Sequence, residues 1–110
     1  MHDHEKEVDR ARAMLPRDEQ LSDLADLFKL FGDSTRMKIL FSLSQGELCV
    51  CAIAELIGME QSAVSHQLKK LKAANLVLAR REGKTVLYRL ADSHVRDVIA
   101  VGFAHLTEGD

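Results

Sequence analysis

The chain has 110 residues, a formal net charge of −2, 46% hydrophobic residues and 5% aromatic residues. This length and composition suit a single domain with an aliphatic core, and a chain with one proline and no low-complexity run is not expected to be disordered. No apolar run approaches the roughly 18 residues of a membrane span and no secretion signal is visible, so we expect a cytoplasmic protein without a membrane partner.

The first part of the chain predicts helices. Residues 1–18 are charged and predict an N-terminal arm, helical over 3–14 and ended by Pro16, whereas residues 19–110 predict one domain. An amphipathic helix closed by Gly32 is predicted by apolar residues at i, i+3, i+4 and i+7 spacing, namely Leu21, Leu24, Ala25, Phe28 and Phe31. Asp33 and Ser34 restart the chain in a second core helix that runs up to Gly46, and a short apolar helix over 49–57 ends at Gly58.

After Gly58 a tight turn leads into another helix over 62–72, in which Val64, Leu68 and Leu71 form the buried stripe. The period then changes, and residues 76–81 and 85–90 read as two strands joined by a hairpin loop that contains Gly83. Residues 95–104 predict a last helix. The expected fold is mostly α with a β-hairpin wing, a winged helix-turn-helix.

Basic charge is concentrated in residues 61–90, where seven Lys and Arg residues stand against Glu82 alone. Such a segment suits the phosphates of double-stranded DNA, and the polar outer face of the helix over 62–72 suits the major groove. A solvated amphipathic helix is the alternative, but a row of small polar residues favours base contacts. The residues expected to meet DNA are Gln61, Ser62, Ser65, His66, Lys69, Lys70, Arg81 and Lys84.

The end of the chain carries four side chains of the kinds that bind zinc, Asp92, His94, His105 and Glu108. On one continuous helix His105 lies about 20° from His94, and Glu108 about 40° to its other side, but the two histidines are roughly 16 Å apart along the axis. One helix therefore cannot close a zinc site, whose ligand distances are about 2.0–2.2 Å. Two antiparallel copies can, which predicts a homodimer with two metal sites between its chains. Asp92 fits this site only if it precedes the helix, near the N-cap. The alternative is a surface helix with scattered polar residues.

Four stretches carry a resemblance to a known family: residues 27–36, 47–51, 61–68 and 80–84. Together they resemble the ArsR/SmtB family of metal-responsive bacterial repressors. The resemblance implies a homodimer whose C-terminal helices pair antiparallel, and which binds operator DNA when metal-free and leaves it when metal binds. It also implies a zinc site, because Asp92, His94, His105 and Glu108 match the zinc-sensing members residue by residue.

Cys49 and Cys51 form a second candidate site, because residues 47–51 partly resemble the thiolate site of arsenic, cadmium and lead sensors. The arm offers no cysteine to complete it, only His2 and His4, with which a mixed Cys/His site is conceivable. On a regular helix the two thiols would point about 200° apart, so they share an ion only if the backbone there is not helical. They are also too close in sequence for an unstrained disulfide. The alternative role is that of small hydrophobes at the start of a core helix.

We therefore expect a zinc-responsive repressor released from an inverted-repeat operator, with cobalt and cadmium as further candidate ions. The alternative is the same repressor sensing cadmium, lead or oxidants through Cys49 and Cys51. An enzyme is not expected: four protein ligands leave no position for a catalytic water, and Cys-x-Cys lacks the thioredoxin spacing. A protein-interaction module that has lost DNA binding is disfavoured by the basic segment over 61–90.

Overall fold

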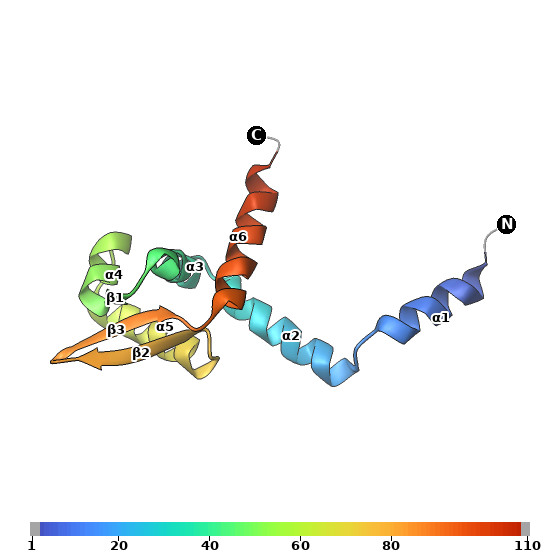
Figure 1. Ribbon diagram of the computed structural model, residues 1–110, viewed down its shortest axis with the longest axis horizontal. Coiled ribbons are helices and arrows are strands. Elements are labelled where there is room, and N and C mark those ends of the chain that lie inside the picture. Colours follow the sequence, from blue (N-terminus) through green and yellow to red (C-terminus); the bar gives the residue numbers. More distant parts are fainter. Residues whose placement is uncertain (1–2, 109–110) are drawn as a thin grey trace.

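The computed structural model describes residues 3–108 and shows a small helical body with a β-hairpin on one side (Figure 1). Its elements in chain order are α1 (His4–Met14), α2 (Asp18–Phe31), α3 (Ser34–Ser42), the 3-10 helix η1 (Leu43–Gln45), β1 (Leu48–Cys49), α4 (Val50–Ile57), α5 (Gln61–Ala73), β2 (Val77–Glu82), β3 (Thr85–Leu90) and α6 (Ser93–Thr107). The arrangement is a winged helix-turn-helix, which confirms the predicted fold class.

Local side-chain chemistry sets several helix ends. Asp33 Oδ2 accepts the backbone N–H of Arg36 at 2.9 Å at the start of α3, and Asp92 Oδ1 accepts that of Val95 at 3.1 Å at the start of α6. Both carboxylates satisfy an N–H that has no partner within its helix. Gly58 ends α4 in the left-handed region, with φ 72°, where glycine has no Cβ penalty. The predicted caps at these residues are confirmed.

The sequence prediction at Cys49 is wrong. The helix predicted over 49–57 begins at Val50, and Leu48 and Cys49 instead form β1, which pairs antiparallel with Tyr88 and Leu87 of β3. This gives a three-stranded sheet in the order β1-β3-β2. A strand of two residues is too short to show a period of two, and it exists because the free edge of β3 supplies its hydrogen-bond partners.

The helix predicted to run up to Gly46 is also shorter. It ends as an α-helix at Ser42 and continues as η1, a tighter 3-10 turn that is common at helix ends. Gly46 then adopts φ 152°, which turns the chain toward β1.

The core lies where α3, α4 and α5 pack against the sheet. Its fully buried side chains are Ile39, Leu40, Leu43, Ile53, Val64, Leu68, Leu71 and Val77. They include the three residues predicted as the buried stripe of α5. This stripe fixes the orientation of α5, because burying one face of a helix leaves the opposite face in solvent.

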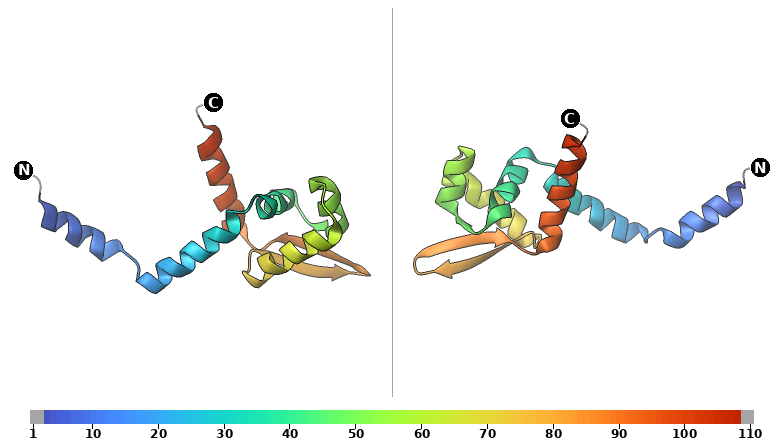
Figure 2. Two further views of the ribbon diagram at one scale, coloured as in Figure 1. Left: turned by 180° about the vertical axis from the view of Figure 1, so that it is seen from behind. Right: turned by 45° about the horizontal axis from the view of Figure 1, so that its top comes forward.

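Helices α1, α2 and α6 project from this body, as both views in Figure 2 show. The radius of gyration is 18.3 Å, whereas a compact domain of this length has about 13 Å. Of the predicted apolar stripe of α2 only Phe31 is buried, and Leu24 and Phe28 are 47% and 51% exposed. Among residues 3–108, no helix combines the length and apolarity needed to cross a membrane.

Candidate DNA-binding surface and metal-binding residues

Helix α5 follows α4 after a short turn and presents a polar outer face. Ser62, His66, Lys69 and Lys70 are exposed on this face, opposite the buried stripe, and Gln61 is exposed at the N-terminal tip of the helix. Ser65 is half-buried, since it follows Val64 at the border between the buried and the exposed face. The structure thus brings together the predicted base-reading residues on one helix, with Ser65 less accessible than expected.

The wing adds two exposed basic residues. Strands β2 and β3 pair from Val77 opposite Leu90 to Glu82 opposite Thr85, and Gly83 makes the turn with φ 63°. Arg81 is paired with Val86 beside this turn and Lys84 lies within it, and both are exposed. The turn is the end of the hairpin farthest from α6 (Figure 1). Exposed cations at the tip of a wing are placed to contact phosphates beside the groove that α5 would occupy.

Arg80 differs from its basic neighbours, because two carboxylates surround it. Its Nε and Nη2 donate to the two carboxylate oxygens of Glu47, each at 2.7 Å, and Nη2 also lies 2.9 Å from Glu82 Oε2. The hydrogen bond from Arg80 lowers the pKa of Glu47, and the bonds to Glu47 and then Glu82 raise the pKa of Arg80. Glu47 and Arg80 are 33 positions apart, and only the pairing of β1 with β3 brings Glu47 to β2, so no local sequence pattern indicates this cluster.

Helix α6 carries the predicted zinc ligands on exposed positions. It is continuous from Ser93 to Thr107, so His94 and His105 keep the shared stripe expected of them. Asp92 lies at the N-cap as predicted, with its Oδ1 3.7 Å from Nδ1 of His94. Glu108 is the C-cap of α6, and its backbone N–H still donates to Ala104 O at 2.8 Å. Its φ of −64° is helical, so its Cβ keeps the direction expected from the stripe, and only the chain after it leaves the helix at ψ 130°.

One protomer places these four residues at two separate ends of α6. Asp92 and His94 form one pair at its start, and His105 and Glu108 stand at its end. Within residues 3–108, no three His, Cys, Asp or Glu side chains gather closely enough to hold a metal ion. A site built from all four residues needs a second copy of the helix.

The two cysteines do lie together, with 3.2 Å between their sulfur atoms. Cys49 has the extended backbone of β1, with ψ 165°, whereas Cys51 is in the first turn of α4. The backbone is thus non-helical at Cys49, which is the condition under which both thiols can face the same point. Both thiols are free. The hydrogen bond between the two thiols lowers the pKa of Cys49 and raises the pKa of Cys51.

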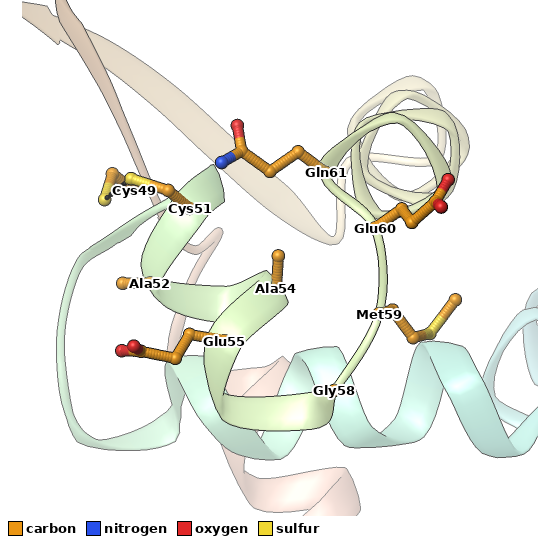
Figure 3. Close-up of a pocket in the computed structure, with 9 residues that line it drawn as sticks. All are labelled: Cys49, Cys51, Ala52, Ala54, Glu55, Gly58, Met59, Glu60 and Gln61. Carbon is orange, nitrogen blue, oxygen red and sulfur yellow. Dashed lines mark hydrogen bonds between the residues drawn. The ribbon is translucent and has the colours of Figure 1, made fainter.

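The thiols border an open pocket of about 860 Å³ between α4 and the start of α5 (Figure 3). It is lined by Cys49, Cys51, Ala52, Ala54, Glu55, Gly58, Met59, Glu60 and Gln61. Figure 3 shows the Gln61 side chain extending over the pocket toward the thiols. His4 begins α1, which lies far from α4 and α5 in Figure 1. His2 lies outside the described residues, so a mixed Cys/His site stays a prediction.

Comparison with known proteins identifies the family. The family model for bacterial regulatory proteins of the arsR family matches residues 33–78. The chain is 41% identical over 106 residues to a cadmium resistance transcriptional regulatory protein CadC homolog from Staphylococcus aureus, covering 96% of this chain and 87% of that protein. The chain belongs to the arsR family of bacterial regulatory proteins.

Solved structures of arsR-family regulators share the fold. The crystal structure of the AntR antimony-specific transcriptional repressor matches with a TM-score of 0.77 at 32% identity, over 86% of each chain. The solution structure of a homodimeric winged helix-turn-helix DNA-binding domain from Mycobacterium bovis matches with a TM-score of 0.72 at 37% identity, over 83% of this chain and 91% of that one. The present arsR-family chain is accordingly a DNA-binding transcriptional regulator and not an enzyme, as the sequence analysis expected.

Proposed function

We propose that this regulator is a metal-responsive repressor that binds inverted-repeat operator DNA as a homodimer and leaves it when zinc binds at the ends of α6. The proposed DNA contacts rest on α5, which carries Gln61 at its N-terminal tip and Ser62 and His66 on its outer face, and on the basic wing tip. A homodimer presents two reading heads, each made of α5 and the wing of one protomer. Their spacing must match two half-sites about one helical turn apart.

The exposed apolar face formed by α2 and α6 supports the dimer. It contains a groove of about 320 Å³ with almost no polar lining, bordered by Phe28, Phe31, Met37, Phe41, Val98, Ile99, Gly102, Phe103 and Leu106. Large apolar surfaces of this kind mark interaction sites, since leaving them in water is unfavourable. The similar domain from Mycobacterium bovis is described as homodimeric. We infer that α6 meets its symmetry mate antiparallel across this face.

The observation that carries the zinc proposal is the unbroken α6 with His94 and His105 on one exposed stripe. Asp92 stands beside His94, and Glu108 is the C-cap of α6, three residues after His105. In an antiparallel pair of α6 helices, Asp92 and His94 of one protomer meet the two C-terminal ligands, a histidine and a glutamate, of its partner. Two imidazoles and two carboxylates are a donor set that suits tetrahedral zinc, with cobalt and cadmium as further candidates.

Regulation follows from the different arrangement that each ligand requires. Operator DNA requires the two reading heads at half-site spacing, whereas an ion held between the two α6 helices restrains the dimer at its axis. If the restrained dimer fits the operator less well, metal weakens DNA binding, and DNA weakens metal binding by the same factor. Protons compete with the ion, since both histidines must be neutral to ligate it.

A titration of zinc against the protein on an inverted-repeat operator, at fixed salt, tests this proposal. We expect zinc to release the wild type and to have little effect on His94→Ala or His105→Ala. Arg96→Ala is the matched control, because Arg96 is exposed on α6 about 200° away from His94. Zinc release that persists unchanged in both histidine variants would show that α6 is not the switch.

The thiol pair supports a second candidate function, in which the same repressor senses cadmium, lead or an oxidant through Cys49 and Cys51. The supporting observation is their 3.2 Å separation beside a pocket. Soft thiolate ligands favour soft ions, and two of the similar proteins are named for cadmium resistance and antimony. Cadmium should produce thiolate-to-metal ultraviolet absorption in the wild type and not in Cys49→Ser with Cys51→Ser. Equal absorption in both proteins would exclude the thiols as ligands.

A further inference from the structure

Residues 47–51 contact the β2–β3 wing on one side and adjoin α5 on the other. Leu48 and Cys49 pair with Tyr88 and Leu87 of β3. Glu47 holds Arg80 of β2 through two hydrogen bonds. Cys51 and Gln61 border the same pocket, so the segment that carries the thiols also adjoins the first residue of α5 (Figure 3).

The position of Arg80 in the sheet explains why Glu47 reaches it. Arg80 is directly opposite Leu87 on β3, and Leu87 is directly opposite Cys49 on β1. Directly opposed residues in antiparallel strands project from the same face, so the three side chains form one row across the sheet. Glu47 lies two residues before Cys49 and extends along that face to the guanidinium. A displacement of Cys49 must therefore move the anchor of Arg80.

The ion pair has the geometry of the stronger surface pairs. Both Glu47 oxygens accept from Arg80 at 2.7 Å, and Glu82 adds a third contact at 2.9 Å. Paired, bidentate Arg–carboxylate bonds in a network stabilise a geometry better than single exposed pairs do. Two carboxylates also offset the charge of Arg80, which makes it a poor phosphate ligand, in contrast to the exposed Arg81 and Lys84 at the wing tip.

We propose that Arg80 is a positioning residue that couples the thiol pair to the wing within one protomer, and that it does not contact DNA. An ion held by Cys49 and Cys51 restrains β1 and, through Glu47 and Arg80, the angle of the wing. This inference rests on the second candidate function, the thiol site. It needs no rearrangement across the dimer axis, so it is independent of the ligands on α6.

The test compares Arg80→Gln with its neighbour Arg81→Gln, using cadmium ion as the probe and the same operator DNA at several salt concentrations. Without cadmium, Arg81→Gln should reduce the magnitude of the negative slope of log affinity against log salt by about one, because one phosphate contact is lost. Arg80→Gln should keep the wild-type slope. With cadmium, all three proteins should show thiolate absorption, and wild type and Arg81→Gln should lose DNA affinity by a factor within the roughly 5- to 150-fold range of allosteric couplings. In Arg80→Gln that factor should fall close to one.

Glu47→Gln breaks the same pair from the other side and should also reduce the cadmium effect. The exchange of both charges, Glu47→Arg with Arg80→Glu, should restore it in part, which a loss through misfolding would not do. Near-ultraviolet circular dichroism checks that each variant is folded.

Three results would overturn the inference, and each has a distinct meaning. A smaller magnitude of the salt-dependence slope in Arg80→Gln would show that Arg80 contacts a phosphate. Undiminished cadmium release of DNA in Arg80→Gln would mean that the ion acts by another route, such as direct obstruction at Gln61. Absence of thiolate absorption in the wild type would remove the thiol site itself, and the inference with it, while leaving the zinc proposal untouched.

Discussion

At the residue scale, the backbone at Cys49 decides what the two thiols can do. A regular helix would direct them about 200° apart. Because Cys49 is extended and Cys51 is helical, their sulfur atoms approach to 3.2 Å. The hydrogen bond between the two thiols lowers the pKa of Cys49 and raises that of Cys51.

This asymmetry predicts the order in which the thiols react as pH increases. A lowered pKa means that Cys49 becomes a thiolate at a lower pH than Cys51, and the thiolate is the reactive form. The rate of alkylation by iodoacetamide, resolved by peptide mass, should therefore have its pH midpoint lower for Cys49. Cys51→Ala removes the hydrogen-bond partner of Cys49 and should shift the midpoint of Cys49 upward. Coincident midpoints in the wild type would contradict the hydrogen bond.

At the element scale, Asp92 serves α6 in two ways. Its Oδ1 accepts the backbone N–H of Val95 at 3.1 Å and lies 3.7 Å from Nδ1 of His94. The same carboxylate is thus the helix cap and a proposed metal ligand. A substitution that removes both roles cannot separate a metal effect from a loss of helix stability.

Two substitutions at Asp92 should separate these roles. Asp92→Ala should lower the free energy of unfolding by about 1 kcal/mol, the usual effect of losing an N-cap, and weaken zinc binding. Asp92→Asn keeps a side-chain oxygen for the cap and should retain nearly all of that stability, yet bind zinc more weakly because the anionic ligand is lost. Denaturant unfolding of the metal-free protein and a zinc competition titration provide the two measurements. Equal zinc affinity in Asp92→Asn and wild type would exclude Asp92 as a ligand.

At the scale of the whole molecule, the protomer leaves much apolar surface uncovered. Phe28 on α2 is 51% exposed, and Val101, Phe103 and Leu106 on α6 are 70%, 54% and 75% exposed. Helix α2 is amphipathic in sequence, but of its predicted apolar stripe only Phe31 is buried in the core of its own chain. Such a surface is expected to be buried against a second copy.

Phe28→Ser should therefore weaken the dimer by tenfold or more (about 1.4 kcal/mol), since a central aromatic side chain is a frequent source of interface energy. Sedimentation equilibrium at several concentrations measures the effect. Leu56→Ser is the matched control, because Leu56 is 65% exposed on α4, outside the apolar groove of α2 and α6. A dimer equally stable in Phe28→Ser and wild type would place the interface elsewhere.

The sequence by itself determined most helices, the hairpin, the buried stripe of α5 and the caps at Asp33, Gly58 and Asp92. These features depend on interactions within a few residues, such as a carboxylate meeting an N–H three positions away or an apolar side chain recurring at helical spacing. The family resemblance, carried by four short stretches, was confirmed by the comparison with known proteins.

Only the tertiary structure decided the part around Cys49. Strand β1 exists because β3 presents an unpaired edge, and Glu47 meets Arg80 because β1 and β2 flank the same strand. Pairing between residues more than thirty positions apart leaves no periodic trace in either segment, so only the folded chain brings Glu47 to Arg80 and turns Cys49 toward Cys51.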